Sequence, residues 1–255
     1  MGEDETRSGH ALRGELQSWL AGPATLDDGW VVLDLDRARE YRPLAVVSQH
    51  YDLADVASPP DVLAFVQQHG LLRHGAGADE HRERLSDFES EALKLRVALR
   101  LNLELRRALT DDLSERAEGL RALRAEPALS TRFEEKALSD LGLLAQASIA
   151  IATTVSEGLR GVELAVAPMF EWSAGELQPF GEVGDFRLAP HAPNLLGYVY
   201  YRVATDIVNR TPMRTCEECG RVFPVADQRQ RFCTPTCASR ARYHRWSKRQ
   251  PSEGE

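Results

Sequence analysis

The stretch "TCEECGRVFPVADQRQRFCTPTCASRARYHRWSKRQ", residues 215–250, decides how the C-terminal part of this chain folds. It holds all the cysteines of the chain in the spacing C-x2-C-x13-C-x3-C. Each close pair can supply two sulfur ligands from one turn, and the spacer lets the chain fold back to complete a tetrahedral shell. The spacing predicts a structural Zn2+ site, with two disulfides or four unrelated buried thiols as the alternatives. The predicted metal ligands are Cys216, Cys219, Cys233 and Cys237.

The residues between the two cysteine pairs predict a knuckle followed by a hairpin. Gly220 stands directly after Cys219, where a tight knuckle often needs a positive φ. Val222 and Phe223 can begin a short strand that covers the metal. Phe232 can end the returning partner of that strand.

The residues after the hairpin predict a helix that carries the last ligand. Thr234 is placed at the N-cap and Pro235 at the first helical position, so Cys237 falls in the first turn. A thiolate there is favoured by the helix dipole and by unpaired backbone N–H groups. A knuckle, a hairpin and a helix with the final ligand make a treble-clef-like zinc finger. We call residues 211–249 the cysteine module.

Positive charge is concentrated in the same region of an otherwise acidic chain. The chain has a net charge of −8, yet residues 210–249 carry ten Lys/Arg against three Asp/Glu. A basic segment on an acidic protein is typical of a surface that contacts nucleic acid. The sequence therefore predicts a nucleic-acid partner, with DNA favoured over RNA.

The predicted helix arranges part of this charge as a stripe. On a helical wheel of about 100° per residue, Arg242, Arg245 and Arg249 fall within about 60° of one another. Such a stripe suits phosphate oxygens, and each contact would make binding salt-sensitive. The alternatives are a solvated basic face, or a face docked on an acidic partner or on the protein's own acidic domain. The predicted nucleic-acid contacts are Arg229, Arg231, Arg240, Arg242, Arg245, Lys248 and Arg249.

The rest of the chain is predicted to be mainly α with minor β. Apolar residues recur every three or four positions in the segment 79–113, which predicts a long amphipathic helix. Alternation predicts strands at 30–35 and within 161–180. Further helices are expected at about 58–70, with Ser58 as cap and Gly70 as stop, and at 112–125, 131–158 and 194–210. The segment 131–158 is apolar enough to be buried on most sides.

These patterns divide the chain into four parts. Residues 1–9 are expected to be disordered, residues 10–210 to form an α-rich domain, residues 211–249 to form the finger, and residues 250–255 to form a disordered tail. The α-rich domain is expected to sense a small-molecule or protein effector or to mediate self-association, so a homodimer is one expected state.

The cysteine module resembles the C-terminal zinc finger of bacterial CGNR-type proteins. That pattern opens with C-x2-C-x3-F, ends its second cysteine pair in Cys-Gly-Asn-Arg and closes with a basic helix. This chain has Cys237-Ala238-Ser239-Arg240 at the tetrad, and its second pair is one residue tighter. The resemblance implies an ABATE-like helical domain before the finger and a role as a transcription regulator. The matching positions are Cys216, Cys219, Phe223, Arg231, Cys233, Cys237, Arg240 and Ala241.

Other function classes find little support in the sequence. No apolar run has the roughly 18–20 residues of a membrane span, and the acidic start lacks the pattern of a secretory signal, which predicts a cytoplasmic protein without a membrane partner. A reducing compartment favours a metal site over disulfides. No nucleotide-binding loop, nucleophile elbow or metalloprotease motif occurs, so we predict that the protein is not an enzyme. An uncharacterised enzyme braced by a structural zinc is the alternative.

Overall fold

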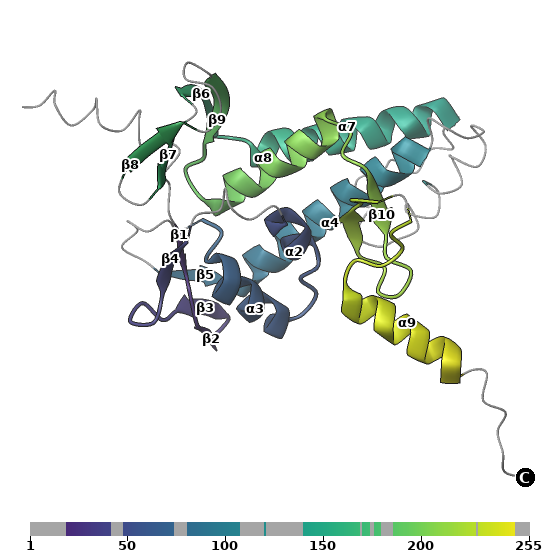
Figure 1. Cartoon of the computed structure of the whole chain (residues 1–255), viewed down its shortest axis with the longest axis horizontal. Helices are drawn as coiled ribbons and strands as arrows, with labels where there is room; N and C mark the ends of the chain where they lie inside the picture. Colours follow the sequence, from purple (N-terminus) through teal and green to yellow (C-terminus); the bar gives the residue numbers. More distant parts are fainter. Residues whose placement is uncertain are drawn as a thin grey trace, which may run out of the picture. The chain divides into compact units, whose positions relative to one another are not determined.

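The computed structural model describes residues 19–41, 48–73, 81–107, 120, 140–168, 170–173, 176–179, 186–227 and 229–247 (Figure 1). The chain divides into two compact units. The first unit comprises Met1–His50, Val56–Ser90 and Val155–Arg202, and the second comprises Tyr51–Asp55, Glu91–Thr154 and Val203–Glu255. The predicted domain boundary at residue 211 stays a prediction. The two termini predicted to be disordered, residues 1–9 and 250–255, lie outside the described residues.

The first unit contains a small antiparallel sheet of order β2-β3-β5, built from Ala24–Asp27, Trp30–Leu33 and Arg82–Arg84. Asp27 pairs with Trp30, so the hairpin loop consists of Asp28 and Gly29 alone. Both loop residues have positive φ, 44° and 78°, which is the conformation that an Asp-Gly hairpin turn favours. The strand predicted at 30–35 is confirmed as far as Leu33. A second pair joins β1 (Trp19–Ala21) to β4 (Arg39–Tyr41).

Helix α3, Pro59–His69, has the predicted bounds. It ends at Gly70, whose φ is 92° and where a Cβ atom would come within 2.2 Å of the Leu20 carbonyl oxygen. At the other end, Ser58 occupies the N-cap but its hydroxyl donates to the Asp61 carboxylate at 2.6 Å. Asp61 in turn accepts from the backbone N–H of Ala57 at 3.2 Å, so Ser58 stands at the N-cap position but makes no side-chain capping hydrogen bond to the helix.

Helix α4, Leu85–Arg107, is shorter at its start than the predicted segment 79–113. Arg82–Arg84 forms strand β5 instead, because Glu83 points inward and pairs with Val31 of β3. Glu83 is 2% exposed, and its Oε2 accepts from the backbone N–H groups of Leu72 at 2.8 Å and Arg73 at 3.3 Å. The predicted apolar face of α4 is confirmed, with Phe88, Ala92, Leu95, Leu99 and Leu103 all buried.

Helix α7, Asp140–Gly158, is less buried than expected. Leu143, Ala147, Ile151 and Val155 are buried at intervals of four residues, which is a single stripe, whereas Ile149 is 64% exposed. The expectation that this segment is buried on most sides is wrong, because many of its other residues are alanine, serine and threonine, which tolerate solvent. The predicted helix at 112–125, except for Leu120, and the start of the predicted helix at 131–158 lie outside the described residues.

In the sequence, the remaining elements of the first unit come after α7 and before the cysteine module. The strands predicted within 161–180 are confirmed, and they pair as β6 with β9 and as β7 with β8. Strand β9 was not predicted. Helix α8, Leu195–Val208, falls within the predicted 194–210 and runs into the second unit. The strand bounds are Glu163–Pro168 for β6, Phe170–Ser173 for β7, Glu176–Pro179 for β8 and Phe186–His191 for β9.

The second unit contains α2 (Gln49–Ala54) from Tyr51 onward and ends in the cysteine module. The module consists of β10 (Met213–Thr215), β11 (Val222–Pro224) and α9 (Pro235–Ser247), and α9 leads toward the C-terminus (Figure 1). Across the described residues taken together, helices outweigh the small sheets, so the mainly α class with minor β is confirmed. None of the helices described is both long and apolar enough to cross a membrane.

Candidate metal centre

The first cysteine pair lies in the loop that joins β10 to β11. The backbone N–H of Cys216 donates to the Arg221 carbonyl at 2.8 Å, and that of Gly220 donates to the Cys216 carbonyl at 3.0 Å. Gly220 has a φ of 75°, as predicted for the knuckle. The chain therefore reverses within a few residues. Strand β11 pairs with β10, and not with residues leading to Phe232 as expected, because the reversal places it beside the strand that precedes the knuckle.

The second pair is positioned by the start of α9. Cys233 precedes the helix and Cys237 lies in its first turn. The hydroxyl oxygen of Thr234 accepts from the Cys237 backbone N–H at 3.2 Å, and the Thr234 carbonyl accepts from Ala238 at 3.1 Å. The predicted N-cap and the predicted place of Cys237 are confirmed.

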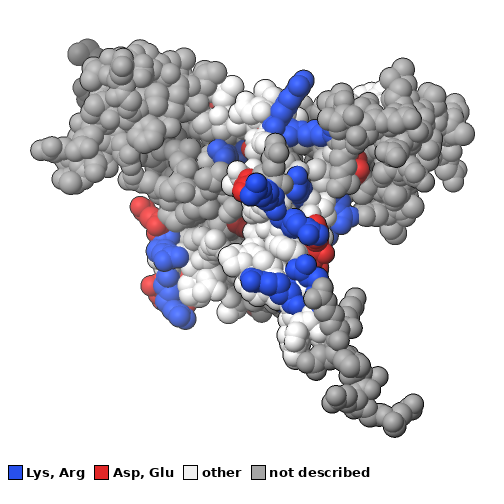
Figure 2. Space-filling model, turned by 45° about the vertical axis from the view of Figure 1, so that its right-hand side comes forward, with Lys and Arg blue, Asp and Glu red and all other residues white. Residues whose placement is uncertain are grey.

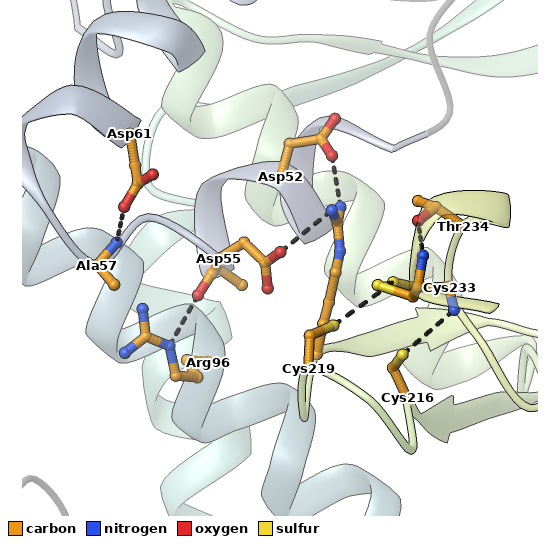
Figure 3. A network of polar contacts seen from close by, with 12 residues as sticks. Asp52, Asp55, Ala57, Asp61, Arg96, Cys216, Cys219, Cys233 and Thr234 are labelled. Carbon is orange, nitrogen blue, oxygen red and sulfur yellow. Dashed lines mark hydrogen bonds and ion pairs between the residues drawn. The ribbon is translucent and has the colours of Figure 1, made fainter. Parts of the chain in front are cut away.

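The four sulfur atoms are brought together, all within 4.8 Å of one another. The Cys233 Sγ lies 3.6 Å from the Sγ atoms of both Cys219 and Cys237. A tetrahedron with metal–sulfur bonds of about 2.3 Å has sulfur–sulfur edges of about 3.8 Å. The cysteines are free thiols, not disulfides, and Figure 3 shows three of the sulfurs turned toward a common point. These four residues could hold one metal ion.

The electrostatics of the cluster also suit a cation. Burial raises the pKa of Cys233, and the neighbouring thiols raise it further. Burial likewise raises the pKa of Cys219. Burial works against ionisation of Cys216 too, but backbone N–H donors from Cys233, Cys219 and Glu218 outweigh it and bring its pKa to about 7. Four thiolates at this spacing repel one another, and a bound cation removes that repulsion.

One side of the cysteine cluster is shielded by apolar side chains. Cys216, Cys237 and Phe223 are buried together, and Val225 and Phe232 pack against them. Cys219, by contrast, is exposed. The cluster therefore combines an apolar wall with one ligand near solvent.

The residue that follows the knuckle connects the module to α2. Arg221 is mostly buried, and its guanidinium pairs with Asp52 of α2 and, at 3.1 Å, with Asp55 just after α2 (Figure 3). Burial lowers the pKa of Arg221, but the hydrogen bond to Asp52 and the charge of Asp55 outweigh it and raise the pKa. Sequence reasoning missed this contact, because Asp52 lies 169 residues away from Arg221 in the chain.

A second arginine holds the segment that joins the end of α8 to β10 of the module. The Arg106 guanidinium of α4 donates to the carbonyl of Thr211 and to the carbonyls of Asp206 at 2.9 Å and Ile207 at 3.2 Å. These carbonyls belong to the C-terminal turn of α8 and the residues after it, where backbone acceptors lack helical partners. The Asp206 carboxylate accepts from the Tyr51 hydroxyl at 2.8 Å and from the Thr211 hydroxyl at 2.8 Å.

The predicted basic residues differ in what they contact. Arg231 makes a bidentate ion pair with Glu217 of the knuckle, which raises the pKa of Arg231 and lowers that of Glu217. Arg242 and Arg245 are exposed, and each donates its Nε to a carbonyl one turn earlier in α9, at 3.2 Å and 3.3 Å. Arg229 and Arg240 are exposed as well, whereas Lys248 and Arg249 lie outside the described residues.

The start of α9 also borders a hollow of about 350 Å³ with Arg229 and Arg231 in its lining. Acidic side chains also accompany basic ones elsewhere in the module, since a carboxylate oxygen of Glu218 lies 3.3 Å from the Nδ1 atom of His244. On the face that Figure 2 presents, Lys and Arg side chains likewise stand beside Asp and Glu side chains in several places. Beyond residue 240, α9 itself carries no acidic residue.

Comparison of the chain with protein-family models, with curated proteins and with solved structures gives no match. The resemblance of the module to CGNR-type fingers therefore stays a prediction.

Proposed function

We propose that this protein is a zinc-dependent nucleic-acid-binding protein that acts as a transcription regulator. The proposal rests on two features that occur at the same site. The four cysteine sulfurs lie within 4.8 Å of one another, and the helix that starts among them is exposed and basic. The module is then a treble-clef-like finger in which a metal ion fixes the helix that contacts the ligand.

The choice of zinc follows from the ligand set. Four thiolates in a small, partly apolar shell are the donors of structural zinc sites, and hard cations such as Mg2+ or Ca2+ prefer oxygen. Cys216, Cys219, Cys233 and Cys237 would hold the ion. Its part would be structural, because all four positions of a tetrahedral shell are filled by the protein.

The choice of nucleic acid follows from the exposed helix. Arg240, Arg242 and Arg245 are exposed on α9, and among the described residues the Nη groups of Arg242 and Arg245 have no hydrogen-bond partner. Phosphate oxygens are the matching acceptors, and three such contacts would give a salt dependence of slope about −3 on double-stranded DNA.

A second candidate is a protein-interaction module whose basic helix binds an acidic partner. The pairs of Arg231 with Glu217 and of His244 with Glu218 favour it, because they show basic groups of the module already holding carboxylates. Those carboxylates belong to the module's own knuckle. Among the described residues, α9 contributes to such a pair only through His244, whose partner Glu218 lies in the knuckle.

The test compares metal content and DNA binding of full-length variants. The change Arg240→Ala/Arg242→Ala/Arg245→Ala should abolish the mobility shift of genomic DNA fragments and leave the metal content unchanged. The control Arg37→Ala/Arg39→Ala/Arg160→Ala removes the same charge from exposed positions of the first unit and should bind like the parent. Equal losses of DNA binding in the two variants would refute a specific role for α9.

A further inference from the structure

We infer that Tyr243 and Trp246 form a stacking platform for unpaired bases, so that α9 binds single-stranded nucleic acid in preference to duplex. This inference rests on the proposed function and names its ligand class more narrowly. It starts from two aromatic side chains for which the fold of the cysteine module has no use.

Both rings are unusually exposed. The exposed fraction is 62% for Tyr243 and 55% for Trp246, and no other aromatic side chain among those described is exposed to this degree. Large aromatic side chains normally contribute to stability by being buried. Keeping two of them in solvent on one helix face marks a surface for a ligand or partner.

The two rings lie next to each other along α9. They are three residues apart, and their centroids are separated by 5.9 Å at an interplanar angle of 37°. On a wheel of about 100° per residue, Trp246 lies about 180° from Cys237. The rings therefore form a ridge on the side of α9 that faces away from the metal ligand.

Arginines flank this ridge on both sides. On the same wheel Arg242 and Arg245 lie on one side of the rings, and Arg240 lies on the other, about 60° beyond Tyr243. The bonds from Arg242 and Arg245 to the carbonyls of Ala238 and Ala241 hold the guanidinium groups along the helix. Aromatic faces between cationic side chains complement a ligand that carries flat rings along an anionic backbone.

Single-stranded nucleic acid matches this chemistry better than duplex does. In a duplex the base faces are already stacked, and separating a step costs a few kcal/mol. A single strand offers its base faces directly, and stacking on an aromatic side chain contributes about 1–3 kcal/mol per base. Residues Pro235–Ser247 contain no Asn, Gln, Asp or Glu, which are the usual readers of adenine and cytosine edges, so we expect little sequence preference.

The experiment measures fluorescence anisotropy of labelled oligonucleotides with the zinc-loaded full chain. Single-stranded DNA and RNA and the corresponding DNA duplex are compared at several salt concentrations. The parent should bind single strands at least about tenfold more tightly than duplex. Tyr243→Ala/Trp246→Ala should lose about 10- to 100-fold in single-strand affinity, given the stacking free energies of single bases, with duplex affinity nearly unchanged.

Two further variants separate stacking from charge. Tyr243→Phe/Trp246→Phe keeps aromatic faces and should retain most of the single-strand affinity, whereas Arg240→Ala/Arg242→Ala/Arg245→Ala should lose binding to both forms. Metal content and thermal unfolding verify that each variant is folded.

The outcomes distinguish this inference from the proposed function. Unchanged single-strand affinity in Tyr243→Ala/Trp246→Ala, or a parent that prefers duplex, would overturn the inference and leave the proposed function standing. A parent that binds no nucleic acid even at low salt would overturn both and would assign this surface to a protein partner.

Discussion

The cysteine module and the first unit of the chain bury their side chains by different means. The first unit has an ordinary apolar core that includes Val31, Phe65, Leu72 and Phe88. In the module, Phe223 packs with two of the cysteines themselves. A segment of about 40 residues rarely buries enough apolar surface to fold without a metal or disulfide. In the module, a bound metal would therefore take the place of an apolar core.

Removal of one metal ligand should give the largest difference between the two regions, because it should unfold the cysteine module and leave the first unit folded. In Cys237→Ser we expect loss of the metal and of hydrogen-exchange protection in α9, with protection in α3 retained. The expected effect is large, because structural zinc contributes about 10–16 kcal/mol to small zinc-finger peptides. The measurement is elemental analysis combined with hydrogen exchange followed by mass spectrometry.

The matched control for that experiment is Ser239→Ala, an exposed position of the same helix. This variant should keep its metal and the hydrogen-exchange protection of α9. Loss of protection in α3 together with α9 in Cys237→Ser would show that the two regions do not fold by separate means.

The first unit should instead respond to pH through Glu83. Burial raises the pKa of Glu83 from 4.5 to about 7. The folded state then binds a proton more tightly than the unfolded state, so this residue lowers stability as the pH rises from about 4.5 through about 7. The loss is at most about 3 kcal/mol and is complete above that range.

The variant Glu83→Gln tests this sign directly. Its amide oxygen can still accept from Leu72 and Arg73, so the variant should be more stable than the parent at pH 8 and should lose this pH dependence. Thermal unfolding from pH 5 to 8 measures the effect, with Glu89→Gln as the control for an exposed carboxylate of α4. A parent whose stability rises over this pH range would contradict the assignment.

A smaller effect is expected where the module meets α2. Arg221→Ala leaves Asp52 and Asp55 without their shared cation, which should cost about 2 kcal/mol for a partly buried pair. Because Arg221 directly follows the knuckle, its loss should also speed removal of the metal by a chelator. Arg214→Ala removes an exposed arginine from β10 and should do neither.

A double-mutant cycle sharpens this prediction. If the two residues act through their contact, adding Asp52→Ala to Arg221→Ala should cost less than Asp52→Ala alone. Additive effects, or equal chelation rates for Arg221→Ala and Arg214→Ala, would show that the ion pair does not brace the metal centre.

The features predictable from the sequence are those set by neighbours in the chain. Gly220 in the knuckle, Thr234 at the N-cap and the gathering of the four cysteines all follow from local spacing, and each was found where predicted. The limits of α3 follow in the same way from Ser58 and Gly70.

The features that could not be predicted depend on distant partners. Arg221 pairs with a residue 169 positions away, and Tyr51 with one 155 positions away, and neither side chain carries a local pattern that reveals it. Strand β5 reads locally as the start of a helix, and only its pairing with β3 makes it a strand. The exposure of Ile149 likewise depends on which face of α7 finds partners.

One metal ion bound by the four sulfurs is expected to fix the start of α9. Zinc-edge X-ray absorption of the purified full chain, with elemental analysis, tests it most directly. The expected result is one zinc per chain with four sulfur neighbours at about 2.3 Å. A metal-free chain whose α9 amides are still protected, or a zinc ion with fewer than four sulfur ligands, would contradict it.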